Sequence, residues 1–269
     1  MKLFYYLILF SIPLGARGQE LFTYSEPASN MAAKSIGFRL NNYIMREKVT
    51  NRTNYHFLPE LMWGISKKLM LHGEGFFSNR NKGFVAEGGL LYLKYRFYST
   101  DEVHSHFRMA AYGRAAINNS DVHQPAIDLN GHNSGYEWGL VATKLINKTA
   151  ISATAGILHA TDNSRGNKFN PGEARDAVGY TLSAGKLFLP KEYVRYEQTN
   201  VNGMLEFPGQ TNLKSGKTFV DAAPSVQFIL LSKMRVDIGY RFPLINDLER
   251  TAGKGFLLRF EYTFFNAVK

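Results

Sequence analysis

The chain has 269 residues, no cysteine and a formal net charge of +10. Without cysteine it can be neither a lipoprotein nor a protein stapled by disulfides. A basic balance often indicates a nucleic-acid partner, but these basic residues do not cluster and many alternate singly with apolar residues. We therefore predict no nucleic-acid binding. No residue pattern predicts a bound cofactor.

The first 18 residues have the layout of a secretory signal peptide. Lys2 supplies the positive start, residues 4–14 form a short apolar core, and Ala16 and Gly18 frame a cleavage site before Gln19. An uncleaved anchor is the alternative, but a spanning helix needs roughly 20 apolar residues. The sequence therefore predicts export through a cleaved signal over residues 1–18, to the outer membrane of a Gram-negative bacterium.

Residues 19–34 follow the signal and show no strand period. Two arrangements fit such a segment. It is either a periplasmic lead-in to the first strand, which we prefer because terminal segments are often loosely held, or a short plug that enters the lumen. The remaining residues, 35–269, are predicted to form the barrel.

From residue 35 onward the chain alternates between apolar and polar side chains. In the last such segment, 255–264, the even positions are apolar while Arg259, Glu261 and Thr263 occupy odd ones. Successive side chains of a strand point to opposite faces, so one face suits lipid and the other suits water. We predict an all-β fold, a transmembrane antiparallel up-and-down β-barrel of about 12 strands. The expected strands are 35–46, 54–65, 69–79, 84–98, 105–117, 134–145, 149–161, 175–188, 192–204, 217–231, 233–243 and 254–265.

The predicted connections alternate in length. Short turns are expected at 66–68, 146–148 and 189–191, whereas 118–133 and 161–174 are long and rich in Asn, Asp, Gly and Pro. Short turns on the periplasmic side and long loops outside are typical of outer-membrane barrels.

Charged side chains of both signs fall on the inward face of the predicted strands. They favour two interpretations: a ladder of cross-strand ion pairs that fills the lumen, or a water-filled passage whose arginines favour anions. The second predicts a channel for small solutes, anions among them. The proposed lumen-lining residues are Arg39, Glu60, Glu74, Arg96, Arg108, Arg114, Arg195, Arg235, Asp237, Arg241, Arg259 and Glu261.

Four inward residues of the second predicted hairpin form a weak metal-site candidate: His56, Glu60, His72 and Glu74. If the turn centres on Lys67, the two carboxylates face one another and repel unless a cation lies between them. That cation is either a metal ion held with His72 or a neighbouring arginine. Our main prediction contains no metal.

A second chemistry is suggested at the end of the seventh predicted strand. His159 and Thr161 there resemble the His-x-Ser-Asn signature of outer-membrane lipid A deacylases and phospholipases, with Thr161 at the nucleophile position and Asp162 where Asn is expected. The alternative function is therefore a lipid hydrolase that uses His159 and Thr161. A third possibility is a closed structural barrel whose loops bind a partner.

The hairpin 58–71, with the sequence Leu-Pro-Glu-Leu-Met-Trp-Gly followed by a turn, resembles outer-membrane barrels grouped with the meta-pathway phenol-degradation transporters. The opening segment 20–31 and the closing segment 262–265 are similar to exported barrels of Bacteroidota. This resemblance implies an outer-membrane barrel that transports small solutes. Its partners would be outer-membrane lipid, the solute and, during biogenesis, the barrel-assembly machinery.

Overall fold

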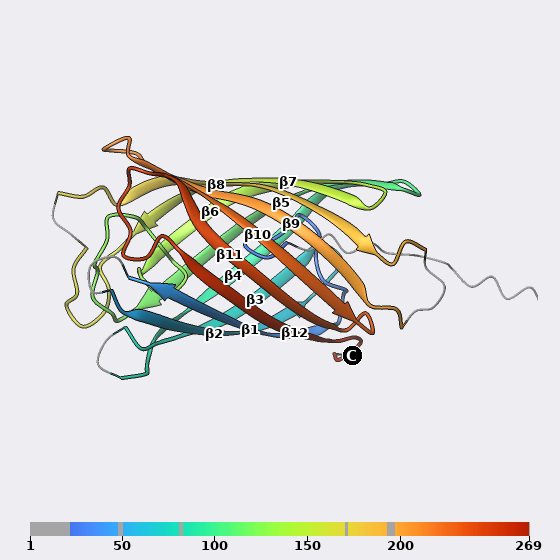
Figure 1. Cartoon of the computed structure of the whole chain (residues 1–269), viewed down its shortest axis with the longest axis horizontal. Helices are drawn as coiled ribbons and strands as arrows, with labels where there is room; N and C mark the ends of the chain where they lie inside the picture. Colours follow the sequence, from blue (N-terminus) through green and yellow to red (C-terminus); the bar gives the residue numbers. More distant parts are fainter. Residues whose placement is uncertain (1–21, 48–50, 81–82, 170–171, 193–196, 269) are drawn as a thin grey trace, which may run out of the picture.

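A computed structural model describes residues 22–47, 51–80, 83–169, 172–192 and 197–268. Twelve antiparallel strands form a closed barrel in which every strand pairs with its neighbours in sequence, and β1 pairs with β12 (Figure 1). The prediction of a barrel with about 12 strands is confirmed. The strands are β1 Ile36–Arg46, β2 Thr53–Gly64, β3 Leu69–Ser78, β4 Val85–Asp101, β5 Ser105–Asn118, β6 Gly135–Ile146, β7 Thr149–Ala160, β8 Asp176–Leu189, β9 Asn200–Asn212, β10 Thr218–Leu230, β11 Met234–Asn246 and β12 Gly255–Phe264.

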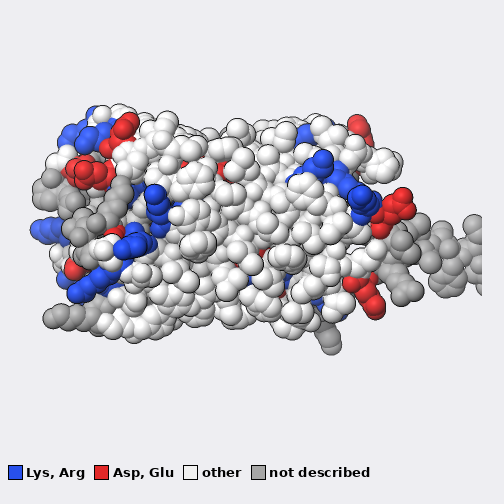
Figure 2. Space-filling view, viewed as in Figure 1, with Lys and Arg blue, Asp and Glu red and all other residues white. Residues whose placement is uncertain are grey.

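The outer wall follows from side-chain alternation. In β6, Trp138 and Leu140 are exposed on the outside, whereas Glu137 and Val141 are buried toward the lumen. Figure 2 shows the result as a broad belt with few charged side chains between two charged ends. In a closed barrel the backbone N–H and C=O groups of every strand can form hydrogen bonds with a neighbouring strand, and the apolar belt matches the hydrocarbon core of a bilayer. Among the described residues, no helix is long and apolar enough to cross a membrane.

The two ends of the barrel differ in their connections. At one end, which we call the turn end, β6 and β7 are joined by only Asn147 and Lys148, and the C-terminus lies there too (Figure 1). At the opposite loop end, residues 119–134 and 161–175 form the longest connections. The short turns predicted at 66–68 and 146–148 and the predicted long loops agree with this arrangement. The short turn predicted at 189–191 was wrong, because β8 ends at Leu189 and β9 begins only at Asn200.

One predicted strand was wrong in its position. The ninth was expected at 192–204, but β9 runs over Asn200–Asn212. Proline cannot donate a hydrogen bond to a strand ladder, yet Pro208 lies within β9, opposite Thr181. The aromatic rings of Phe188 and Tyr180 cover Gly203 and Gly209, which have no side chain of their own to pack.

Two segments fold into the barrel. Residues 22–35, here called the plug segment, enter the lumen and include the buried residues Phe22, Thr23 and Ala28. Residues 119–134, the inward loop, turn inward at the loop end and bury Ile127 and Leu129. An apolar cluster joins this loop to the walls; its buried members are Leu58, Met70, Phe76, Leu90, Tyr92, Ala116, Ile127, Leu129, Leu158, Ala160, Phe169 and Ala177.

Candidate functional site in the barrel lumen

The start of the plug segment is held by one buried carboxylate, that of Glu206 on β9. Its Oε1 accepts hydrogen bonds from the backbone N–H groups of Thr23, at 2.7 Å, and Tyr24, at 2.8 Å. Its Oε2 accepts one from the hydroxyl of Ser25, at 2.7 Å. Because Glu206 is fully buried, these donors replace the water that the carboxylate would otherwise need. Glu206 is therefore the main anchor of the plug segment.

The middle of the plug segment binds two cations of the opposite wall. The Glu26 carboxylate lies 2.8 Å from Nη1 of Arg39 on β1 and 3.7 Å from Nζ of Lys94 on β4. Lys94 also donates hydrogen bonds to the carbonyl oxygens of Pro27, at 2.6 Å, and Ser29, at 2.8 Å. Lys94 is fully buried, and the plug segment supplies the acceptors that replace water around its ammonium group.

Further contacts fasten the plug segment around the lumen. Ala28 donates its backbone N–H to the hydroxyl of Thr143 on β6, at 2.9 Å, and Lys34 donates its own to the Gly64 carbonyl, at 2.6 Å. On the far wall, Ser225 of β10 donates to the Thr23 hydroxyl, at 2.9 Å. Contacts on so many strands mean that the segment crosses the lumen rather than following one wall. The described residues 22–34 therefore lie inside the barrel, whereas residues 19–21 of the predicted segment lie outside the described residues.

Arg39 is the centre of the largest ion-pair network in the described lumen. Besides Glu26, it lies 3.0 Å from Glu60 of β2 and 2.8 Å from Glu261 of β12. Arg235 continues the network to Glu261, at 2.9 Å. Asp237 then lies 3.2 Å from Arg235 and 3.6 Å from Arg259. The guanidiniums of this network, which were expected to line an anion path, are thus paired with carboxylates, and only the Arg39–Glu26 pair involves the plug segment.

The other predicted lumen residues are placed nearer the ends. Arg114 pairs with Glu137, and Arg108 lies 2.9 Å from Asp101 while its Nη1 donates to Ser29. Arg241 pairs with Asp221, which also binds Arg250 of the β11–β12 loop. Arg96 is half-buried on β4. Arg195 lies outside the described residues.

The inward loop narrows the loop end of the lumen. Gln210 of β9 holds Ile127 from both sides, accepting from its N–H at 2.9 Å and donating to its carbonyl at 2.7 Å. Arg80 donates to Ser120, at 2.6 Å, and to the His132 ring. Burial, and after it the Arg80 guanidinium, holds the pKa of His132 well below its usual range. The ring is therefore neutral and can accept this hydrogen bond.

The residues of the metal-site candidate are only partly brought together. Glu60 and Glu74 are direct partners in the β2–β3 register, and Nδ1 of His72 lies 2.5 Å from Glu60. His56, however, is four residues farther along β2, roughly 13 Å away, and stacks on His132 of the inward loop. Arg39 supplies the cation beside Glu60. In the described ranges no group of three or more His, Asp or Glu side chains could hold a metal ion.

His159 lies on the outer wall at the loop end, not in the lumen. Its Nδ1 is 2.8 Å from Asp176 of β8, and its ring stacks on Tyr136 with the centroids 5.0 Å apart. Thr161 donates its backbone N–H to the Ser134 carbonyl, and Asp162 pairs with Arg175. The structure thus gives His159 a carboxylate partner that was not foreseen. It records no hydrogen bond between the described side chains of His159 and Thr161.

Several residues of the site were not predicted. Glu206 and Gln210 were assigned to a loop because the ninth strand was expected to end before them. Their spacing held a signal, since Glu206, Gln210 and Asn212 all occupy even positions of a segment with Leu205 and Phe207 at odd ones. The plug partners of Lys94 lie more than sixty residues earlier in the chain, where no local pattern connects them to β4.

Comparison with known proteins supports the architecture. No family model and no curated protein matches the chain. Among solved structures, "KdgM porin" has a TM-score of 0.56 at 8% identity, over 85% of this chain and 99% of that one. The fold is that of outer-membrane β-barrels. The COG4313 outer membrane channel from Pseudomonas putida F1 also has a TM-score of 0.56, at 12% identity, over 89% of this chain and 100% of its own.

Proposed function

We propose that the chain is an outer-membrane channel for small solutes whose lumen is closed by the plug segment and opens when that segment leaves. The observation that supports this function is the chemistry of the wall behind the plug segment. That wall carries hydroxyls, carboxylates and cations, such as Thr143, Glu206 and Lys94, and its buried apolar contacts with the plug segment form two small clusters, around Phe22 and Ala28. Such groups can exchange plug contacts for water at a modest net cost, about 1 kcal/mol per hydrogen bond.

Anions are the solutes that the open lumen would favour. Glu26 leaves together with the plug segment, whereas Lys94 stays on the wall. The recorded partners of Lys94, namely Glu26, Pro27 and Ser29, all belong to the plug segment. Arg39, in contrast, keeps Glu60 and Glu261. Opening therefore adds net positive charge at mid-lumen, and a cationic side chain in a pore favours anions.

We predict that Glu206→Gln increases opening of the channel. The substitution removes the charge that three plug donors share. Hydrogen bonds to charged groups contribute roughly 1.5–3 kcal/mol, so the open fraction should rise roughly ten- to a hundredfold. Single-channel recording in a planar bilayer measures this fraction, and reversal potentials in a salt gradient should show anion preference.

Glu249→Gln is the matched control, because Glu249 is an exposed carboxylate of the β11–β12 loop. It should leave opening unchanged. A Glu206→Gln protein that folds into a heat-modifiable barrel but stays as silent as the parent would contradict the proposal.

The finer assignments are part of the same proposal. We infer export by a signal over residues 1–18, insertion by the barrel-assembly machinery and a Bacteroidota source. We also infer kinship with the meta-pathway phenol-degradation transporters, which the hairpin 58–71 supports. Its Trp63 is exposed on the outer wall close to the turn end, as expected for an interfacial aromatic residue.

The hydrolase alternative has one favourable observation, the His159–Asp176 pair on the lipid-facing wall. A carboxylate that orients a histidine is one element of a hydrolytic site. Release of fatty acid from lipid by the folded barrel would support the hydrolase alternative. This activity should then be abolished by His159→Ala and by Thr161→Ala. A folded parent barrel that releases no fatty acid would rule out the hydrolase alternative.

A further inference from the structure

The outer wall carries charge at few positions. In the described strands, the outward-facing charged or histidine residues near the loop end are Arg46, His159 and Asp176, and those near the turn end are Lys144 and Lys186. The two lysines are on β6 and β8, on either side of β7. Because Lys144 pairs with Ile151 and Lys186 pairs with Thr149, both side chains flank the same short stretch of β7.

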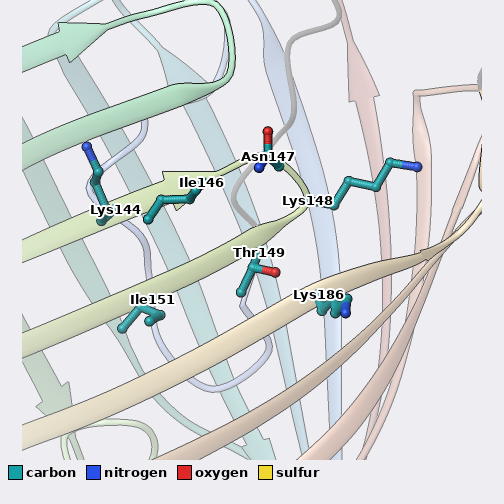
Figure 3. A pocket seen from close by; sticks show the side chains of 7 residues that line it. All are labelled: Lys144, Ile146, Asn147, Lys148, Thr149, Ile151 and Lys186. Atoms are coloured by element: carbon teal, nitrogen blue, oxygen red, sulfur yellow. The ribbon is translucent and has the colours of Figure 1, made fainter.

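A pocket of about 500 Å³ lies between these lysines on the outer wall. Figure 3 shows Lys144 on one side, Lys186 on the other, and Thr149 and Ile151 on the strand between them. Ile146 adds a second apolar side chain. The pocket thus combines two cations with the apolar side chains of Ile146 and Ile151.

The charge of the two lysines is positive, and the described residues provide no recorded counterion for either of them. Among the described residues, neither Lys144 nor Lys186 has a recorded hydrogen bond or ion pair. Lys148 adds a third positive charge at the turn, where its ammonium donates to the carbonyls of Pro190, at 3.0 Å, and Lys191, at 2.5 Å. These bonds fasten the β6–β7 turn to the chain that leaves β8. The rim of the pocket is therefore held in place from both sides.

We propose that this pocket binds the phosphate group of an anionic phospholipid in the periplasmic leaflet. An ammonium group attracts phosphate as a point charge, and lysine stems lie along apolar surface while their heads reach the interface. The acyl chains would then run over Ile146 and Ile151. The inference rests on the membrane placement in the proposed function, but it does not require conduction.

The test is native mass spectrometry of the refolded protein in a non-ionic detergent, with phosphatidylglycerol as the probe and phosphatidylcholine as the zwitterionic comparison. Near an anionic surface, the loss of one lysine charge weakens lipid binding about fivefold. The double variant Lys144→Gln/Lys186→Gln should therefore bind phosphatidylglycerol roughly 25-fold less tightly. The variant Lys67→Gln/Lys68→Gln removes the same charge at the β2–β3 turn of the same end and should bind as the parent does.

Equal losses in both double variants would overturn the proposal, because binding would then follow net charge alone. Equal binding of phosphatidylcholine by the parent would overturn it too. Inorganic phosphate that displaces phosphatidylglycerol at equal concentration would assign the pocket to a soluble anion instead of a lipid. Where the double variant fails to migrate as a heat-modifiable barrel, the two single variants carry the same test, with about a fivefold loss expected for each. A folded protein that binds lipid but never conducts would contradict the proposed channel function and leave the lipid site supported.

Discussion

A protein that lacks residues 22–31 should conduct steadily in a planar bilayer, whereas the parent should be closed for most of the recording. The deletion removes Glu26 and the backbone groups that occupy Glu206 and Lys94, but it leaves the closed ladder of twelve strands intact. Water then replaces the plug contacts along the wall. Reversal potentials should show anion preference, because Lys94 remains without its recorded partners.

The same deletion combined with Lys94→Gln should keep its conductance and lose most of its anion preference. Arg108→Gln in the deleted chain is the comparison, because Arg108 keeps Asp101 as a wall partner only 2.9 Å away and contributes less free charge. Its effect on selectivity should be smaller. A deleted chain that forms a heat-modifiable barrel and stays silent would show that the inward loop alone closes the lumen.

Replacing Arg39 with methionine should cause the largest loss of stability among the lumen residues. Arg39 is buried and joins Glu26, Glu60 and Glu261, so its removal leaves three carboxylates close together without their shared cation. Removing one partner of a buried ion pair typically costs 3–5 kcal/mol, and water that enters the lumen reduces this penalty. We expect the free energy of unfolding to fall by about 3 kcal/mol.

Urea unfolding of the refolded barrel, followed by tryptophan fluorescence, measures this change. Arg241→Met is the matched control, because Asp221 retains Arg250 at 2.5 Å when Arg241 is lost. It should cost clearly less than Arg39→Met. Similar costs for the two variants would mean that the network around Arg39 contributes no special stability.

The barrel walls could be predicted because alternation is a local property of the sequence. In β12 the outward face carries Phe256, Leu258 and Phe260, and the inward face carries Arg259 and Glu261, as expected. The prediction failed at β9, where glycines and Pro208 interrupt the pattern. There the strand depends on aromatic side chains of β8, and such cross-strand packing cannot be recognised within one segment.

The interior could be predicted only in part. The alternation within the second predicted hairpin indicated that Glu60 and Glu74 face one another, and the β2–β3 register confirms this pairing. The cation beside Glu60 is Arg39 of the neighbouring strand β1, which corresponds to the second of the two alternatives, a neighbouring arginine instead of a metal ion. The plug contacts could not be predicted from the sequence. Thr23 and Glu206 are 183 residues apart, and the segment that contains Thr23 has no strand periodicity. Long-range polar contacts of an irregular segment leave no local pattern.

The most direct test of plug-controlled opening is single-channel recording of the variant Thr23→Cys/Ser225→Cys under oxidising and then reducing conditions. The two hydroxyls are 2.9 Å apart, and the chain contains no other cysteine, so a disulfide would join the plug segment to β10 alone. The account predicts no openings while the disulfide is intact and anion-selective openings after reduction, with each single-cysteine variant insensitive to the reductant. Equal conductance in the oxidised and reduced protein would contradict it.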